Sequence, residues 1–121
     1  MITHNILEED GIAVLEPDGP LSKEDFRALS EAVDTYLGSH DSLTGLLIRT
    51  RKFPGWEDFG GLVGHIRFVR HHHRKIRKIA LLSDSRITSI APMLADHFIS
   101  AEVKSFGYDS SEKALAWLRA E

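Results

Sequence analysis

Short apolar runs alternate with longer stretches of helical periodicity along the chain, and this alternation limits the fold more than any other feature. The runs Ile12–Glu16 and Leu43–Ile48 are largely apolar on both faces, as strands buried within a sheet are. A stripe with helical spacing lies between them, formed by Phe26, Leu29, Val33, Tyr36 and Leu37. Because strands separated by helices pair in parallel through right-handed crossovers, the pattern predicts an α/β fold.

The first two runs predict a hairpin. Ile2–Leu7 and Ile12–Glu16 are separated by Glu8-Glu9-Asp10-Gly11, and Asp-Gly is a favoured hairpin turn because glycine tolerates positive φ. The first strand should therefore run antiparallel to its neighbour and lie at an edge of the sheet.

The remaining elements follow from start and stop signals. Ser22 is a suitable N-cap for the first helix, with Asp25 three residues on, and Gly38 is a suitable end. Further strands are expected over Ile76–Leu82 and Glu102–Phe106. Three more helices are expected: one with an apolar face of Phe59, Leu62, Val63, Ile66 and Val69, one over Ile87–Phe98, and a last one capped by Ser110 or Ser111. The prediction is a mixed sheet of about five strands, the first antiparallel and the rest parallel, with about four helices.

Composition narrows the class of protein. A chain of 121 residues suits one domain spanning residues 1–121. It has no cysteine, which excludes disulfides and thiolate chemistry and fits a reducing cytosol. No cationic and then apolar leader opens the chain, and no apolar run approaches the roughly 20 residues of a membrane span. We therefore expect a cytoplasmic protein with no transmembrane segment.

Four local patterns carry a resemblance to a known family. They are Phe53-Pro54-Gly55-Trp56, Ile79-Ala80-Leu81-Leu82-Ser83-Asp84, Ala101-Glu102-Val103-Lys104-Ser105-Phe106, and Glu112-Lys113-Ala114-Leu115-Ala116-Trp117-Leu118. With the order of elements, they make the chain resemble the SpoIIAA-like family, which shares the fold of STAS domains. The resemblance implies a right-handed β-α superhelix and a regulatory or ligand-binding role.

The chain departs from the family in one respect. The resemblance implies a phosphorylatable Ser or Thr, usually after an Asp, following the third strand. Thr50 is the only hydroxyl there, and Arg49 precedes it. The pair Asp84-Ser85 has the expected order but follows the fourth strand. The sequence therefore argues against a phospho-switch of the usual kind.

Positive charge gathers in the middle of a chain whose net charge is −3. The cations of this stretch are Arg49, Arg51, Lys52, Arg67, Arg70, Arg74, Lys75, Arg77 and Lys78. They suit an anionic partner, such as a phospholipid headgroup, a nucleotide or an acidic protein surface, or simply a solvated helix end and strand edge. Peripheral membrane contact stays an alternative. Nucleic acid is not expected, because the whole chain is acidic and lacks an RNA-binding aromatic motif.

The run His71-His72-His73 does not predict a metal site. Neighbouring helical residues point about 100° apart, so three in a row do not face one ion. The alternative is an exposed helix end whose cations complement the helix dipole.

The most promising site follows the third strand. Phe53 and Trp56 flank a Pro-Gly turn at the carboxyl end of a parallel strand, where open α/β sheets bind ligands. Gly60, Gly61 and Gly64 would let a ligand approach the next helix closely. The alternative is that Trp56 covers the core and the glycines permit tight packing.

These observations favour a non-enzymatic binding or regulatory module that takes a small amphiphilic or anionic ligand at the carboxyl ends of the parallel strands. The candidate contacts are Phe53, Trp56, Phe59, Gly60 and Arg67, with Arg51 and Lys52 as anion contacts. A STAS-like regulator of a partner protein is the second hypothesis, and an enzyme is the third. No catalytic motif, metal site or cofactor is predicted. A homodimer is expected if helices cover only one face of the sheet.

Overall fold

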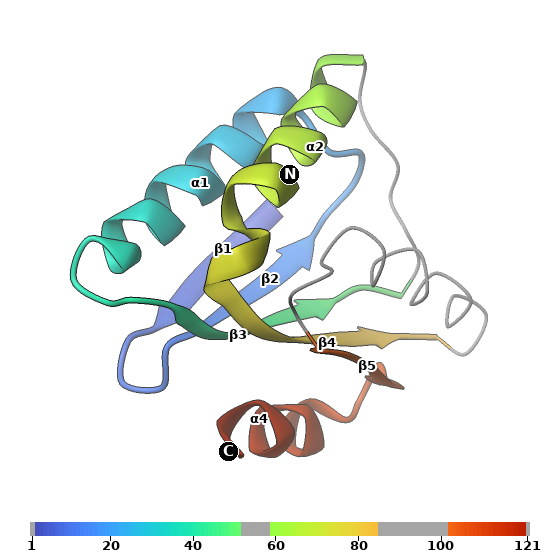
Figure 1. The fold of residues 1–121 in the computed structure, drawn as a ribbon. Helices are drawn as coiled ribbons and strands as arrows, with labels where there is room; N and C mark the ends of the chain where they lie inside the picture. Colours follow the sequence, from blue (N-terminus) through green and yellow to red (C-terminus); the bar gives the residue numbers. More distant parts are fainter. Residues whose placement is uncertain (1, 52–58, 85–101, 121) are drawn as a thin grey trace.

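The structure is a computed structural model that describes residues 2–51, 59–84 and 102–120 (Figure 1). Its centre is a five-stranded sheet in the order β1-β2-β3-β4-β5. The strands are β1 Ile2–Leu7, β2 Ile12–Pro17, β3 Leu43–Arg49, β4 Ile76–Ser83 and β5 Glu102–Gly107. β1 pairs antiparallel with β2, and the other pairs are parallel. The mixed sheet expected from the sequence is confirmed, including the antiparallel first strand.

Helices lie on both faces of this sheet. They are α1 Lys23–Leu37, α2 Phe59–His72 and α4 Ser111–Arg119, and the short 3-10 helix η1 His73–Lys75 follows α2. α1 and α2 lie side by side on one face, and α4 lies on the other (Figure 1). The described part of the chain holds three α-helices where about four were expected. The helix expected over Ile87–Phe98 lies outside the described residues.

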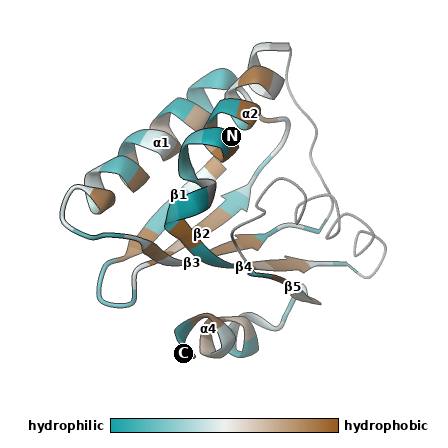
Figure 2. Cartoon of the chain, viewed as in Figure 1, coloured by the Kyte–Doolittle hydropathy of each residue, from teal (hydrophilic) through white to brown (hydrophobic). Residues whose placement is uncertain are grey.

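The strands bury apolar side chains on both faces. Figure 2 shows hydrophobic residues along the central strands in brown. Toward α1 and α2 the strands contribute Ala13, Leu15, Leu43, Leu46, Ile76 and Ile79. Toward α4 the buried cluster is Ile12, Leu47, Ala80 and Leu82, with Ala114 and Leu118 from the helix. One chain thus accounts for the double-sided apolar pattern of its central strands. The expectation that helices leave one face of the sheet open is wrong, because α4 covers that face, so the condition on which a homodimer was expected is not met.

The turn and capping residues expected near the start of the chain adopt their expected roles. Gly11 takes a positive φ of 68° in the β1–β2 turn, a backbone conformation that glycine adopts without strain. Ser22 caps α1 in a reciprocal capping box with Asp25, and Gly38 follows the last helical residue. These signals set where β2 begins and where α1 begins and ends.

The predicted apolar face of α2 is partly wrong. Val69 is buried as expected, but Val63 is only half-buried and Ile66 is 41% exposed. Phe68 and His72 are buried instead. The side chains of Phe59 and Leu62 lie outside the description.

Two glycines explain the rotation of α2. A Cβ on Gly61 would overlap the Leu21 carbonyl oxygen, and one on Gly64 would lie 3.4 Å from the Phe26 side chain. The glycine-bearing face of α2 is thus the one that packs closely against the start of α1, and this turns Ile66 outward. A periodicity argument that weighs only large apolar side chains misses this contact.

Candidate functional site

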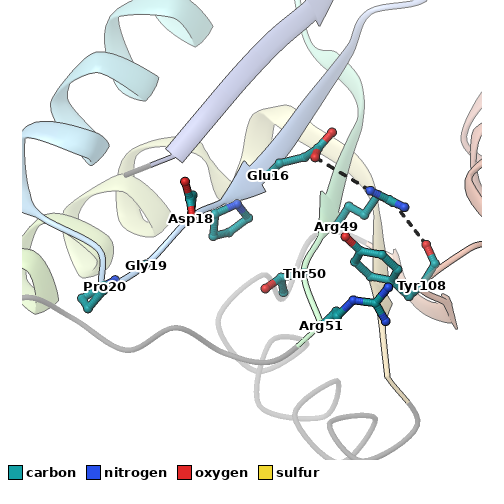
Figure 3. A pocket seen from close by; sticks show the side chains of 9 residues that line it. Glu16, Asp18, Gly19, Pro20, Arg49, Thr50, Arg51 and Tyr108 are labelled. Carbon is teal, nitrogen blue, oxygen red and sulfur yellow. Dashed lines mark hydrogen bonds and ion pairs between the residues drawn. The ribbon is translucent and has the colours of Figure 1, made fainter.

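A cleft of about 420 Å³ opens at the carboxyl ends of β2 and β3 (Figure 3). Its lining residues are Glu16, Pro17, Asp18, Gly19, Pro20, Arg49, Thr50, Arg51 and Tyr108. They come from the end of β2 and its following loop, the end of β3, and the residue after β5. Parallel strands bring these segments to one edge of the sheet, where ligand sites of open α/β sheets lie.

An aromatic ring lies between two arginines on one wall of the cleft. The Cζ atom of Arg49 is 3.9 Å from the centroid of the Tyr108 ring, and that of Arg51 is 4.0 Å from it. Figure 3 shows the ring between the two guanidinium groups. Arg49 is the last residue of β3 and Arg51 lies two residues beyond it, so both side chains reach the ring from the same end of the strand. Cation–π attraction of this kind fixes both side chains against the ring.

The Arg49 guanidinium is held by further contacts. Its Nε donates a hydrogen bond of 3.2 Å to the Tyr108 carbonyl oxygen. Its two terminal nitrogens lie 3.8 Å from carboxylate oxygens of Glu16 and Asp109. These separations exceed hydrogen-bond length, so the carboxylates balance the charge of Arg49 without using its terminal N–H donors.

Arg51 is similarly placed but more exposed. Its terminal nitrogen Nη1 lies 3.6 Å from a carboxylate oxygen of Asp84. The Arg51 side chain is 63% exposed, whereas that of Arg49 is 28% exposed. The strand itself is fixed here, because the Thr50 N–H donates to the Leu82 carbonyl oxygen at 2.9 Å. The end of β3 and the two residues after it therefore present two guanidinium groups at the cleft, both stacked on one ring.

This arrangement suits an anion chemically. Guanidinium groups bind carboxylate and phosphate through paired N–H donors, and here their ring stacking restricts their motion before a ligand arrives. The exposed edge of Tyr108 and the ring of Pro17 or Pro20 add apolar surface to the lining. Glu16 and Asp18 bring negative charge to the same cleft, so a ligand must place its anionic group beside the arginines.

The structure places some of the sequence-predicted site residues and not others. Arg51 lines the cleft. Arg67 is exposed on α2 and is not a lining residue, and Gly60 lies half-buried in the first turn of α2. Lys52, Phe53 and Trp56 lie outside the described residues, as does the side chain of Phe59.

Sequence reasoning missed Arg49 and Tyr108 as a pair. Arg49 and Arg51 alternate at the end of a strand, which places both on one side of it. The parallel register pairs Arg49 with Leu82 and Leu82 with Phe106, so Tyr108 follows just beyond that row. The contact between Tyr108 and Arg49 can therefore be predicted only when the order and register of the strands are known.

The histidines have structural partners. The His72 side chain is buried between Phe68 and Asp34, and the His65 ring stacks on Phe26 at a centroid distance of 5.0 Å. The exposed helix end expected at this run is therefore wrong for His72, whereas His71 is exposed.

Among the residues that the structure describes, no three His, Cys, Asp or Glu side chains cluster to hold a metal ion. Within the same ranges, no helix is long and apolar enough to cross a membrane.

Comparison with known proteins agrees with this architecture. A crystal structure of an uncharacterized protein from the DUF3478 family with a SpoIIAA-like fold, from Shewanella loihica PV-4, superposes with a TM-score of 0.75 at 18% sequence identity. The match covers 98% of this chain and 92% of that one, and it shows the fold. A comparison with curated proteins gives no match.

The family follows from the sequence itself. The SpoIIAA-like family model matches residues 12–119, which include every strand and helix described above except β1. The chain belongs to the SpoIIAA-like family.

Proposed function

We propose that this protein is a non-enzymatic binding module that takes a small anionic or amphiphilic ligand in the cleft at the ends of β2 and β3. The observation that supports this most is the Tyr108 ring between Arg49 and Arg51. Both arginines line the cleft, and their terminal nitrogens lie 3.6 to 3.8 Å from carboxylate oxygens, without a hydrogen bond to a described residue.

The balance of charge supports a small ligand over a large polyanion. The cleft volume of about 420 Å³ lies within the range of small-molecule sites. Glu16, Asp18 and Asp84 surround the arginines, so an extended chain of negative charge would meet repulsion on each side. A ligand with one anionic group and a short apolar part meets the arginines and the Tyr108 and proline surfaces together.

The test compares three probes on the purified full chain: inorganic phosphate, dodecyl phosphate below its micelle concentration, and dodecyltrimethylammonium as a cationic amphiphile. Isothermal titration should detect dodecyl phosphate most strongly and the cationic amphiphile not at all. Arg49→Met and Arg51→Met should each weaken dodecyl phosphate binding about tenfold, since each removes a charged hydrogen-bond donor group.

Arg27→Met is the matched control. Arg27 is an exposed arginine of α1 whose partners are Glu24 and Glu31 on its own helix, so its loss should leave dodecyl phosphate binding unchanged. Equal binding by wild type and both cleft variants, with circular dichroism showing that all are folded, would exclude the cleft as the anion site.

A regulator of a partner protein is the second candidate, and membership of the SpoIIAA-like family favours it. Native mass spectrometry of protein purified from its own cells separates the two candidates. A bound small molecule supports the ligand module, and a stoichiometric protein partner with no small molecule supports the regulator.

A further inference from the structure

One side of α2 carries positive charge that the proposed cleft does not use. No Asp or Glu occurs from Phe59 to Ser83. The exposed cations of this stretch are Arg67, Arg70, Arg74, Lys75 and Arg77. Lys78 differs from them, because its Nζ donates to the carbonyl oxygens of Trp117 and Ala120 at the end of α4.

The helix geometry gathers part of this charge around an apolar side chain. α2 turns Phe68 and His72 toward the interior, so Ile66, Arg67 and Arg70 occupy the opposite side at about 100° per residue. Ile66 is 41% exposed and is the one large apolar residue that is exposed among the described residues. We call Ile66 and the five exposed cations the basic ridge; the cations are Arg67, Arg70, Arg74, Lys75 and Arg77.

The cations of the basic ridge form no ion pair with the residues that the structure describes. Ion pairs within the described ranges involve Arg27, Arg49, Arg51, His72 and Arg119, and none involves the basic ridge. Surface arginines are usually spaced among carboxylates, so a run of unpaired cations leaves a local positive field on a chain whose net charge is −3.

We propose that the basic ridge docks the protein onto a bilayer that contains anionic phospholipid. A bilayer offers partners to both parts of the basic ridge, because lipid phosphates contact the cations and the headgroup region admits the Ile66 side chain. Polar or charged groups of a nucleic acid would leave Ile66 without an apolar partner. An anionic bilayer matches both the positive charge and the exposed isoleucine.

The test measures co-flotation of the full chain with vesicles of phosphatidylcholine alone and with vesicles in which about a third of the lipid is phosphatidylserine. Binding should require phosphatidylserine and should fall when salt rises from about 0.1 M to about 0.5 M, because the Debye length shortens. Each cation near the surface contributes about fivefold to partitioning, so the Arg67→Gln/Arg70→Gln/Arg74→Gln variant should bind about 100-fold more weakly. Ile66→Ser should weaken binding about fivefold without changing its dependence on salt.

The matched control removes the same charge elsewhere, in Arg27→Gln/Lys104→Gln/Lys113→Gln, whose positions are exposed on α1, β5 and α4. This variant should float with the anionic vesicles much more strongly than the ridge variant. Equal loss in the two variants would show dependence on net charge only and would overturn the proposal. Binding to duplex DNA or to a polyglutamate peptide without binding to phosphatidylserine vesicles would also overturn it, in favour of a different anionic partner. Arg51→Met should float as wild type does, which separates the basic ridge from the cleft. Loss of flotation in that variant would assign lipid binding to the cleft and overturn the proposal.

Discussion

The Nε2 atom of the buried His72 lies 2.8 Å from a carboxylate oxygen of Asp34, which joins α2 to α1 through side chains. The other ring nitrogen, Nδ1, lies 2.8 Å from the Phe68 carbonyl oxygen one turn earlier in α2. The imidazole also stacks on the Phe68 ring at a centroid distance of 4.5 Å. The ring is therefore fixed by both nitrogens and by one face, although it belongs to a run of histidines that looks like a solvated helix end.

Replacing Asp34 should loosen this contact between the helices. Asp34→Ala leaves the buried His72 nitrogen without its carboxylate and should lower the free energy of unfolding by about 1 kcal/mol, since the Asp34 side chain is partly solvated. Urea denaturation measures the change. Asp41→Ala is the control, because Asp41 is exposed and bonds to no other described residue. An equal loss of stability in the two variants would contradict a structural role for the His72–Asp34 contact.

A pH dependence is expected from Asp25 at the start of α1. Partial burial raises the pKa of this carboxyl, but hydrogen bonds from the backbone and side chain of Ser22 and from the Ile2 N–H outweigh it, and the pKa is lowered from 3.8. Its two oxygens accept from Ile2 and Ser22 at 3.2 and 2.8 Å. A carboxyl with a lowered pKa in the folded state contributes stability that is present above its unfolded pKa and is lost as the pH falls.

Asp25→Asn should therefore lower the free energy of unfolding by about 1 kcal/mol at neutral pH, because an amide has one oxygen for the two N–H donors. The difference from wild type should shrink as the pH falls below 3.8 and the wild-type carboxylate protonates. Ser22→Ala should narrow the pH dependence, since it removes the 3.1 Å bond from the Asp25 N–H and the Ser22 side-chain hydrogen bond that helps to lower the Asp25 pKa. Urea denaturation at neutral and acidic pH measures both variants. A constant deficit for Asp25→Asn at every pH would contradict the assignment.

Local signals predicted the elements well because each depends on a few neighbouring residues. The Asp10-Gly11 turn, the Ser22 cap and the limits of the central strands are set by backbone conformation and by burial on two faces of a strand. The rotation of α2 was missed because it depends on the backbone at Leu21, which is distant in sequence from Gly61. Glycines count against a helix in propensity scales, yet here one of them marks the contact face.

The site was also predicted only where local signals suffice. The topology of parallel sheets predicts that ligands bind where β3 ends, and it predicts Arg51 as a contact. Tyr108 was not named, because it lies 57 residues after Arg51 in the sequence, and only the register of three strands brings it beside the arginines. The residues Phe53 and Trp56 lie outside the described residues, so their expected role in the site stays a prediction.

The two glycines of α2 should respond oppositely to a methyl group. Gly61→Ala would place a Cβ on the Leu21 carbonyl oxygen, a backbone atom that cannot move aside alone, and should cost about 2 kcal/mol or more of the free energy of unfolding. Gly64→Ala meets Phe26 at 3.4 Å, an ordinary contact, and should be neutral or stabilising by up to about 1 kcal/mol through helix propensity. Thermal and urea unfolding measure both variants. Equal stabilisation by the two substitutions would show that α2 does not approach Leu21 so closely.

Substitutions of Tyr108 test whether its ring orients Arg49 and Arg51 for anion binding. Tyr108→Phe keeps the face on which Arg49 and Arg51 stack, and the hydroxyl has no hydrogen bond to a described residue, so dodecyl phosphate binding should stay within about twofold of wild type. Tyr108→Ala removes the ring, leaves the two guanidinium groups to repel each other across a gap, and should weaken binding about tenfold. Phe106→Leu is the control, because Phe106 of β5 packs on Trp117 of α4 and does not line the cleft. Isothermal titration compares the three variants, and circular dichroism establishes that each is folded. If Tyr108→Ala binds as tightly as wild type, the ring does not orient the arginines, and anion binding, where it occurs, depends on their charge alone.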